Sequence, residues 1–245
     1  MQETLSILVP AYNEAATIST ALQRLWAVEL PIPYEIIVVD DGSTDASVDI
    51  VSGLQKESPV AMKLVRHAAN SGKTAAIRTG LEHVSNTLTL IYDADLEYDP
   101  ADIPALIAPI LEGRADAVYG SRFLSPQRRP RFSWHTLGNR LVTLMANVFA
   151  GLKLTDMETC FKLIRSDTLK AMRFRSERFG YEPEVTVKLG RLGHRVHEVP
   201  ISYSGRSYEE GKKIKWWDGV RAAGTIFRAG VLESPLADPD AAKKP

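Results

Sequence analysis

Short apolar runs alternate with amphipathic stretches through the first half of the chain. The apolar runs are rich in β-branched residues and predict strands over 5–10, 34–40, 61–66, 87–93 and 115–121. The stretches between them place apolar residues at helical spacing and predict helices over 14–26, 45–56, 72–84 and 101–112. Four β-α repeats followed by a fifth strand indicate an α/β fold with one doubly wound, mostly parallel sheet.

The second half of the chain has a less regular pattern. A basic, proline-containing loop over 126–131 leads to a predicted helix over 132–152, and a helix over 182–192 precedes an extended segment over 195–204. Residues 233–245 are rich in Pro, Asp, Ala and Lys and lack apolar periodicity, so we expect disorder there. The pattern predicts one domain over 1–232, with a mixed C-terminal region, and a short tail.

The composition excludes several classes of protein. Thirty basic residues balance thirty acidic ones, which argues against a nucleic-acid binder with a basic excess. A single cysteine, Cys160, excludes an intrachain disulfide and favours a reducing, cytoplasmic location. We find no secretory signal pattern and no run approaching the ~20 apolar residues of a spanning helix. We therefore expect membrane contact to be peripheral or through an integral-membrane partner.

Polar residues gather at the predicted carboxyl ends of the strands, where doubly wound sheets bind ligands. They are Asn13, Asp40, Asp41, Asp93, Asp95 and Arg122. Asp93-Ala94-Asp95 closes the strand predicted over 87–93, so the carboxylates of Asp93 and Asp95 point the same way, because side chains two apart on a strand share a face. Two hard oxygen ligands suit Mg²⁺ or Mn²⁺, although an isolated pair of this kind is more often a solvated turn.

Two further segments combine turn chemistry with ligand-binding potential. Asp40 and Asp41 end a strand, where their carboxylates could accept hydrogen bonds from a base or a ribose, while capping explains the Ser, Thr and Asp that follow. The Gly72-Lys73-Thr74 sequence is not a Walker A motif, because His67 stands where that motif needs glycine. A Gly-Lys pair that opens a helix still suits an anion.

These segments, in this order, resemble the family 2 inverting glycosyltransferases of the GT-A fold, particularly the dolichyl- or polyprenyl-phosphate sugar synthases. The resemblance runs from Leu5 to about Arg228. It is carried by Val-Pro-Ala-Tyr-Asn-Glu at 9–14, Asp-Asp-Gly-Ser-Thr-Asp at 40–45, Asn-Ser-Gly-Lys at 70–73, Asp-Ala-Asp at 93–95 and Gly-Ser-Arg at 120–122.

The resemblance implies roles for individual residues. The nucleotide sugar would lie against Pro10, Tyr12, Glu14, Asp41, Lys73, Asp93, Ala94 and Asp95. Mg²⁺ or Mn²⁺ would bind Asp93 and Asp95, with Glu97 as a third ligand where relatives often have Gln. The segment 155–162 resembles the acceptor region, with Cys160 where relatives commonly have Gly. The segment 204–212 resembles a loop that closes over phosphates, with Arg206 and Lys212 as contacts.

The nature of the acceptor decides the mechanism. A polyprenyl phosphate with a second pKa of ~6 is already ionised at neutral pH and needs no base. Its phosphate would be held by Arg122, Arg206 and Arg131, while Asp95 and Arg122 assist catalysis. If the acceptor is a sugar or glycolipid hydroxyl, Asp156 or Glu158 becomes the general base. GDP-mannose and UDP-glucose are the leading donors.

The surface chemistry leaves the membrane question open. Apolar residues at helical spacing follow Arg128, Arg129 and Arg131, and fit either a core helix or a membrane interface. The apolar residues are Trp134, Leu137, Leu141, Leu144, Val148 and Leu152. A basic and aromatic cluster over 212–217 fits either a membrane interface or a solvated loop followed by a packed Trp pair. The competing functions are a nucleotidyltransferase, although the glycine-rich loop typical of that class is missing after the first strand, and a non-catalytic sugar-nucleotide binding subunit of a membrane complex.

Overall fold

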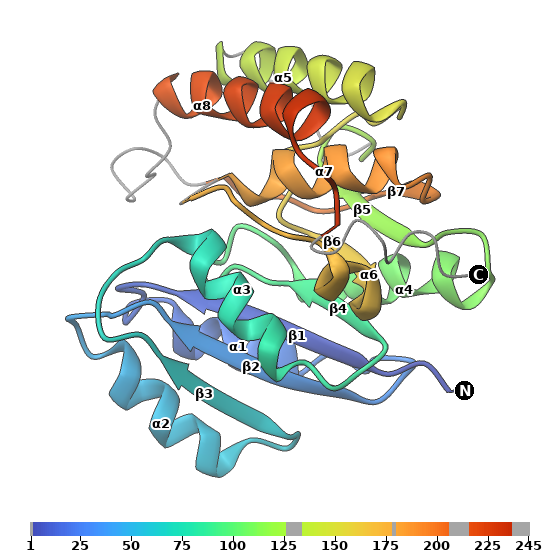
Figure 1. The fold of residues 1–245 in the computed structure, drawn as a ribbon. Coiled ribbons are helices and arrows are strands. Elements are labelled where there is room, and N and C mark those ends of the chain that lie inside the picture. Colours follow the sequence, from blue (N-terminus) through green and yellow to red (C-terminus); the bar gives the residue numbers. More distant parts are fainter. Residues whose placement is uncertain (1, 126–133, 178–179, 206–215, 237–245) are drawn as a thin grey trace.

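The computed structural model describes residues 2–125, 134–177, 180–205 and 216–236, and contains one seven-stranded sheet in the order β3-β2-β1-β4-β6-β5-β7 (Figure 1). Every strand pair is parallel except the two that involve β6. The strands are β1 (Leu5–Ala11), β2 (Tyr34–Asp40), β3 (Met62–Arg66), β4 (Leu88–Ile91), β5 (Ala117–Ser121), β6 (Lys162–Arg165) and β7 (Val196–Pro200). The predicted α/β fold with a mostly parallel sheet is confirmed.

Helices flank the sheet, and those predicted for the first half of the chain are present within a few residues of their expected limits. A 3₁₀ turn (Pro100–Asp102) leads into α4, and a π-helical turn (Arg228–Leu232) continues α8. The helices are α1 (Ile18–Trp26), α2 (Ser47–Glu57), α3 (Lys73–His83), α4 (Ile103–Leu111), α5 (Trp134–Ala150), α6 (Ser166–Ala171), α7 (Tyr181–Arg191) and α8 (Trp216–Phe227).

The central strands are buried on both faces, which explains their continuous apolar sequences. In β2 the run Ile36, Ile37, Val38 and Val39 is at most 1% exposed. Alternation of apolar and polar residues is absent because α3 covers one face and α1 the other (Figure 1). Gly80 lets α3 approach closely, since a Cβ there would lie 3.1 Å from a methyl group of Leu8.

Strand β6 was not predicted, and its composition explains why. It has only four residues and begins with Lys162, whose side chain is fully buried. The Lys162 ammonium donates to the carbonyl oxygens of Met157 and Thr159 and lies 4.7 Å from the centre of the Tyr119 ring. A lysine in a short run predicts a loop, but here its charge is satisfied locally and the strand enters the sheet.

Helices α5, α7 and α8 form a separate layer above the second half of the sheet (Figure 1). A small apolar cluster joins them, made of Ala146, Met157, Val187, Ile226 and Ala229. Gly190 allows α7 to reach α5, because a Cβ there would lie 2.1 Å from the carbonyl oxygen of Ala150. Helix α8 was not predicted. None of the helices in the described ranges combines the length and apolarity that a membrane span requires.

Packing continues past the predicted domain end at residue 232. Glu233 is only 8% exposed, and Leu236 forms an antiparallel bridge with Met172. Residues 237–245 lie outside the described residues, and the disorder expected over 233–245 stays a prediction. The sequence over 233–236 has no apolar periodicity, so it gave no sign that Glu233 is buried or that Leu236 pairs with Met172.

Candidate functional site

The loops that follow β1 and β2 are tied into one ledge by side chain to backbone hydrogen bonds. Asn13 has a positive φ of 53°, and its Oδ1 accepts from the Thr44 amide at 2.9 Å. In return, Ser43 Oγ accepts from the Asn13 amide and Ser47 Oγ accepts from the Glu14 amide, both at 2.9 Å. The sequence therefore fixes this edge of the sheet with its own Ser, Thr and Asn residues before any ligand arrives.

Three predicted nucleoside contacts lie on or beside this ledge. Pro10 is part of β1, and Tyr12 directly follows that strand with 37% of its surface exposed. The carboxylate of Glu14 accepts from the Thr17 hydroxyl at 3.0 Å, just before α1. The structure thus places these three residues, which the family resemblance implied, at one edge of the sheet, and their contact with a nucleoside stays a prediction.

Asp41, the fourth predicted nucleoside contact, anchors the start of α3. Its Oδ2 accepts from the Gly72 amide at 2.7 Å, and its Oδ1 accepts from the Ser71 amide at 2.9 Å and lies 2.7 Å from Nδ1 of His67. Gly42 is required beside it, because φ is 74° and a Cβ would meet the Ala69 backbone at 2.6 Å. This structural role was not evident from the sequence.

Lys73 joins three segments that are far apart in the sequence. Its Nζ donates to Asp93 Oδ2 and to Glu182 Oε1, each at 2.8 Å, and lies 3.7 Å from Cys160 Sγ. Burial alone would lower the pKa of Lys73, but the negative charges of Asp93 and Glu182 hold that pKa well above its usual value. Glu182, at the start of α7, is a partner that the sequence analysis missed, because it was predicted only as the first residue of a helix.

Asp93 and Asp95 do not extend the strand as predicted. Strand β4 ends at Ile91, so both carboxylates belong to the loop that follows. Oδ1 of Asp95 accepts from the Glu97 amide at 3.1 Å across Leu96, whose φ is 64°, while Ala94 is buried. The strand geometry used to align the two side chains is therefore wrong, although both residues stay at the ligand-binding edge of the sheet.

Glu97, the predicted third metal ligand, forms two hydrogen bonds with residues 203–204. Its Oε2 accepts from the Tyr203 hydroxyl at 2.7 Å, and its carbonyl oxygen accepts from the Ser204 amide at 2.9 Å. Tyr203 also pairs with Tyr98 in an isolated bridge. In the described part of the chain, no three His, Cys, Asp or Glu residues form a group suited to a metal ion. Glu97 holds the 200–205 segment against this loop, and metal binding by Asp93, Asp95 and Glu97 stays a prediction.

Asp156, one of the two predicted general bases, forms an ion pair with Arg122, which makes its carboxylate a weak base. The Nε and Nη2 atoms of Arg122 donate to the two carboxylate oxygens at 2.7 Å each, and the Asn139 amide adds a bond at 3.2 Å. Asp156 is fully buried; burial would raise its pKa, but the charge and hydrogen bonds of Arg122 lower it. The pair fixes the Arg122 guanidinium, which lies 5.0 Å from the centre of the Tyr203 ring.

Glu158, the other predicted base, has a different environment. Its Oε1 is buried and has no hydrogen-bond partner. Burial, and then repulsion from Glu182, raises the pKa of Glu158 to about 7, while burial lowers the pKa of nearby Lys162 to about 8. A carboxyl group that titrates near neutrality can exchange a proton, so Glu158 has the chemistry that Asp156 lacks. The predicted phosphate contacts Arg131, Arg206 and Lys212 lie outside the described residues.

A scan of family models matches the model described as Glycosyl transferase family 2 to residues 6–173. Among curated proteins, the chain is 28% identical over 246 residues to the undecaprenyl-phosphate mannosyltransferase of Micrococcus luteus, covering 88% of this chain and 96% of that protein. It is 29% identical to the undecaprenyl-phosphate 4-deoxy-4-formamido-L-arabinose transferase of Edwardsiella ictaluri and 26% identical to the dodecaprenyl-phosphate galacturonate synthase of Rhizobium johnstonii. These two matches cover 84% and 85% of this chain but only 62% and 61% of those proteins.

Solved structures show the same fold. The glucosyl-3-phosphoglycerate synthase from Mycobacterium tuberculosis, in complex with Mn²⁺, uridine diphosphate and glucosyl-3-phosphoglycerate, superposes with a TM-score of 0.70. Sequence identity is 19%, and the match covers 95% of this chain and 81% of that one. A complex of the same enzyme with Mg²⁺ and uridine diphosphate also has a TM-score of 0.70. The likeness confirms the predicted GT-A arrangement of sheet and helices.

Proposed function

Because the chain belongs to glycosyl transferase family 2, we propose that it transfers a hexose from a nucleotide diphosphate sugar to a polyprenyl phosphate at a membrane surface. Three curated relatives carry undecaprenyl or dodecaprenyl phosphate in their names, which supports this acceptor. The observation that carries the proposal is the Arg122–Asp156 pair. Arg122 would supply positive charge to the acceptor, while the ion pair makes the Asp156 carboxylate a weak base. This arrangement suits an acceptor that is already an anion and needs no base.

The donor would occupy the ledge at the carboxyl ends of β1, β2 and β4. Pro10, Tyr12, Glu14 and Asp41 would surround the nucleoside, and GDP-mannose or UDP-glucose is the expected donor. Asp93 and Asp95 fit a divalent cation in ligand type, since Mg²⁺ and Mn²⁺ prefer carboxylate oxygens, although Lys73 already holds one oxygen of Asp93. Such a cation would neutralise charge on the departing diphosphate.

The reaction would proceed by inversion. An oxygen of the polyprenyl phosphate attacks the anomeric carbon as the bond to the nucleoside diphosphate breaks, so one C–O bond forms and one is lost. Arg122 would orient the acceptor phosphate, and Lys73 would place positive charge beside the leaving group. A phosphate monoester with a second pKa of ~6 is largely a dianion at neutral pH, so the step requires no proton acceptor.

A hydroxyl acceptor is the second candidate function, and the raised pKa of Glu158 is the observation that favours it. Here Glu158 would take the proton from a sugar or glycolipid hydroxyl. The two functions differ in their pH dependence, because only the second one needs a deprotonated Glu158 and should lose its rate in Glu158→Gln.

The test is mass spectrometry of the products formed from purified protein, Mn²⁺, a panel of nucleotide sugars and a short polyprenyl phosphate in detergent. A mass gain of one hexose on the lipid phosphate, lost on chelation, supports the proposal and identifies the donor. Donor hydrolysis without a lipid product redirects the search to hydroxyl acceptors. Sugar-nucleotide binding without any turnover would instead indicate a non-catalytic binding subunit.

A further inference from the structure

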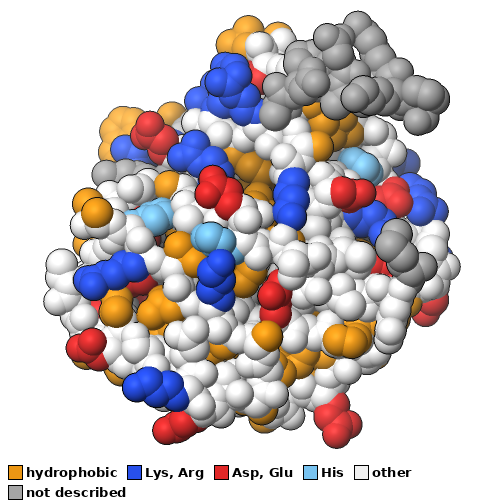
Figure 2. All heavy atoms as spheres, turned by 60° about the horizontal axis from the view of Figure 1, so that its bottom comes forward, with side chains coloured by type: hydrophobic (Ala, Val, Ile, Leu, Met, Phe, Trp, Pro, Cys, Tyr) orange, Lys and Arg blue, Asp and Glu red, His pale blue; other side chains and the backbone are white. Residues whose placement is uncertain are grey.

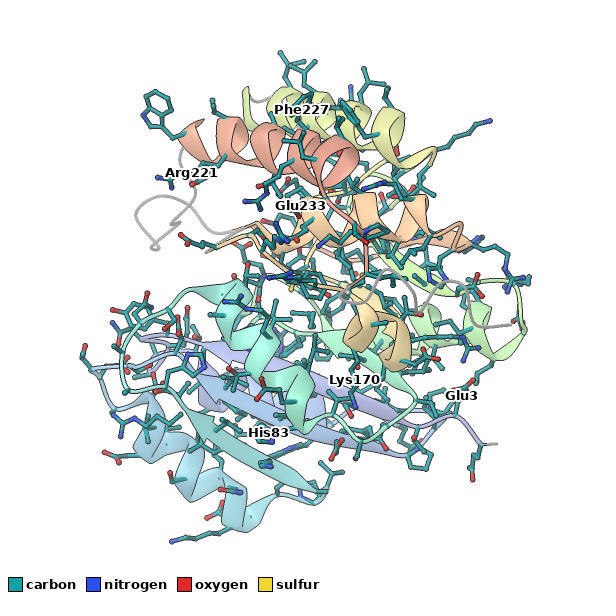
Figure 3. The ribbon with its side chains drawn as sticks, in the orientation of Figure 1. Glu3, His83, Lys170, Arg221, Phe227 and Glu233 are labelled. Atoms are coloured by element: carbon teal, nitrogen blue, oxygen red, sulfur yellow. The ribbon has the colours of Figure 1, made fainter. Side chains whose placement is uncertain are left out.

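Exposed apolar side chains are concentrated on one layer of the molecule. Eleven large hydrophobic side chains are exposed among the described residues, and eight of them belong to α5, α8 and the π-helical turn. These eight are Leu141, Leu144, Val148, Trp217, Val220, Phe227, Val231 and Leu232. Figure 3 shows side chains projecting from α5 and α8 away from the sheet. The face drawn in Figure 2, in contrast, carries Lys, Arg, Asp and Glu side chains interspersed. We call the eight residues the apolar ridge.

Arginines border the apolar ridge on α8. Val220 and Phe227 are exposed, and the next residue in each case, Arg221 and Arg228, is turned ~100° further around the helix. This places the guanidinium groups between the ridge and the buried face of α8, which contains Ile226. Arginine in this position can bury its methylene groups beside apolar surface while its charged end reaches polar groups.

A cavity of about 500 Å³ lies beside these arginines, between α8 and a facing wall formed by residues 175–177 and Gly180. Figure 3 shows Arg221 on the underside of α8, on the side away from the upward-pointing side chains. The cavity is lined from α8 by Asp218, Arg221, Ala222, Gly224, Thr225 and Arg228, and from the facing segment by Arg175, Ser176, Glu177 and Gly180. Three guanidinium groups thus meet around one hollow.

Two buried polar atoms in the lining of the cavity make no hydrogen bond. Ser176 is 3% exposed, and its Oγ has no partner. Nε of Arg228 is buried 3.1 Å from Oε1 of Glu233, yet makes no hydrogen bond. Arg175 comes no closer than 3.9 Å to that carboxylate, and Arg221 lies 3.4 Å from Asp218. The carboxylates of Glu177 and Asp218 share the lining, so the charge is mixed, and the buried polar atoms of the lining that make no hydrogen bond are Oγ of Ser176 and Nε of Arg228.

We propose that this cavity binds the phosphate of an anionic membrane phospholipid while the apolar ridge contacts its acyl chains. A phosphate supplies several acceptor oxygens, which match guanidinium forks and the Ser176 hydroxyl. An apolar surface bordered by arginines is the arrangement that favours the boundary between headgroups and hydrocarbon. The choice of a lipid over a soluble phosphate rests partly on the proposed membrane-borne acceptor, and the cavity is separate from Arg122 and Lys73.

The experiment measures binding to vesicles without any sugar nucleotide, so its result does not depend on transfer. Full-length protein is floated with vesicles of phosphatidylcholine alone or of phosphatidylcholine and phosphatidylglycerol in equal parts. The variants are Arg175→Gln and Arg221→Gln, whose side chains are 50% and 70% exposed, and whose loss should not affect folding. Arg114→Gln removes the same charge from a residue of similar exposure beside Glu112 and is the matched control.

We expect stronger binding to the phosphatidylglycerol vesicles, weakened about fivefold by each cavity variant and unchanged in Arg114→Gln. Ser176→Ala should weaken binding as well, without changing the net charge. Equal losses in all three arginine variants would show general electrostatic attraction and overturn the cavity assignment, as would equal binding to both vesicle types. Thermal stabilisation by inorganic phosphate, lost in Arg175→Gln and Arg221→Gln, without vesicle binding would assign the cavity to a soluble anion and overturn the lipid.

Discussion

The N-terminal region, from β1 to β4, and the C-terminal region, from β5 to Leu236, bury different kinds of side chain. In the first, Asp40 and Asp41 are the charged side chains among the described residues that are almost completely buried. The second buries six, namely Asp156, Lys162, Glu182, Glu184, Lys188 and Glu233. It also exposes the apolar ridge.

This difference in buried and exposed side chains indicates that the two regions are stabilised by different interactions. The N-terminal region has an apolar sheet core covered by helices, and its stability comes mainly from the burial of apolar side chains away from water. The C-terminal region keeps its charges inside by pairing them, and part of its apolar surface faces outward. Removing one partner of a buried pair leaves an unpaired charge, which is costly. Four experiments break or sharpen this comparison.

The largest effect is expected when a buried pair in the C-terminal region loses one partner. Lys188 and Glu184 are both fully buried and in contact, and the Lys188 ammonium also lies 5.5 Å from the centre of the Phe174 ring. Lys188→Ala should lower the free energy of unfolding by roughly 3–5 kcal/mol, because Glu184 is left charged and buried. Urea denaturation followed by circular dichroism measures this.

The matched control in the N-terminal region is Arg66→Ala. Arg66 is 59% exposed and lies 3.6 Å from Asp40, so its loss should cost less than about 1 kcal/mol. The double variant Lys188→Met with Glu184→Gln should recover part of the stability lost in Lys188→Ala. Equal losses for Lys188→Ala and Arg66→Ala would remove the distinction between the regions.

At the junction of the two regions, Asp95→Ala should reduce sugar transfer by roughly 10²–10³-fold, the usual cost of losing a group that stabilises developing charge. The fold should be kept, because the Asp95 bond to the Glu97 amide is local. Initial rates of lipid-linked product and unfolding curves measure the two effects separately. Asp99→Ala is the control, since Asp99 caps the Ala101 amide nearby and should keep full activity. Unchanged turnover in Asp95→Ala would remove Asp95 from the reaction.

A smaller effect is expected in the pH dependence of stability. The native pKa of Glu158 is raised from 4.5 to about 7, so between these values the native state keeps a proton that the unfolded state releases. The free energy of unfolding should therefore fall as pH rises through this window, by at most ~1.4 kcal/mol per pH unit. Glu158→Gln should flatten that fall.

Lys162 should act in the opposite sense at higher pH. Its native pKa is lowered from 10.5 to about 8, so the unfolded state holds a proton that the native state lacks, and stability should rise with pH across that range.

Denaturation midpoints of wild type and Glu158→Gln at about pH 5 and about pH 7.5 test the predicted effect of Glu158 on stability. Parallel curves for the two proteins would contradict the raised pKa.

The smallest effect on stability is expected on the apolar ridge. Leu144 and Val148 are 61% and 73% exposed, so Leu144→Ser and Val148→Ser should change the free energy of unfolding by less than about 0.5 kcal/mol. Leu22→Ala, on the fully buried face of α1, should lower the free energy of unfolding by roughly 2–5 kcal/mol. Both ridge variants should bind phosphatidylglycerol vesicles more weakly, whereas Leu111→Ser on α4 should not. A destabilisation of ridge variants comparable to Leu22→Ala would show that the ridge is part of the core.

The regular N-terminal region could be predicted because its periodicity and turn residues agree at every step. In the C-terminal region, the segments predicted over 115–121, 132–152, 182–192 and 195–204 match β5, α5, α7 and β7. Strand β6 was missed because it includes the buried Lys162, and α8 was missed because it follows a basic segment that was interpreted as a solvated loop or a membrane contact. The fold class and the family followed from motifs, because Gly, Ser and Asp residues at strand ends define local geometry. These signals are readable from neighbours in the sequence.

The candidate site was predicted less completely. Motifs identified Lys73 and Asp93 but gave no sign that Glu182, more than a hundred residues from Lys73, shares that ammonium. Glu97 and Asp156 were assigned from their positions in segments that resemble the family, and the structure shows that their carboxylates accept hydrogen bonds from Tyr203 and Arg122. A side chain's partner across the fold depends on tertiary contacts that a single sequence does not show.

The position of β6 has a consequence for how the chain is made. β6 lies between β4 and β5, so β4 has an open edge, and β5 has no place in the sheet, until residues 162–165 have left the ribosome. About seventy residues separate the end of β4 from the start of β6. At roughly 5–20 residues per second, the nascent chain would expose this edge for several seconds. Synthesis rate and chaperone access in that interval therefore govern how much of the protein reaches its native sheet.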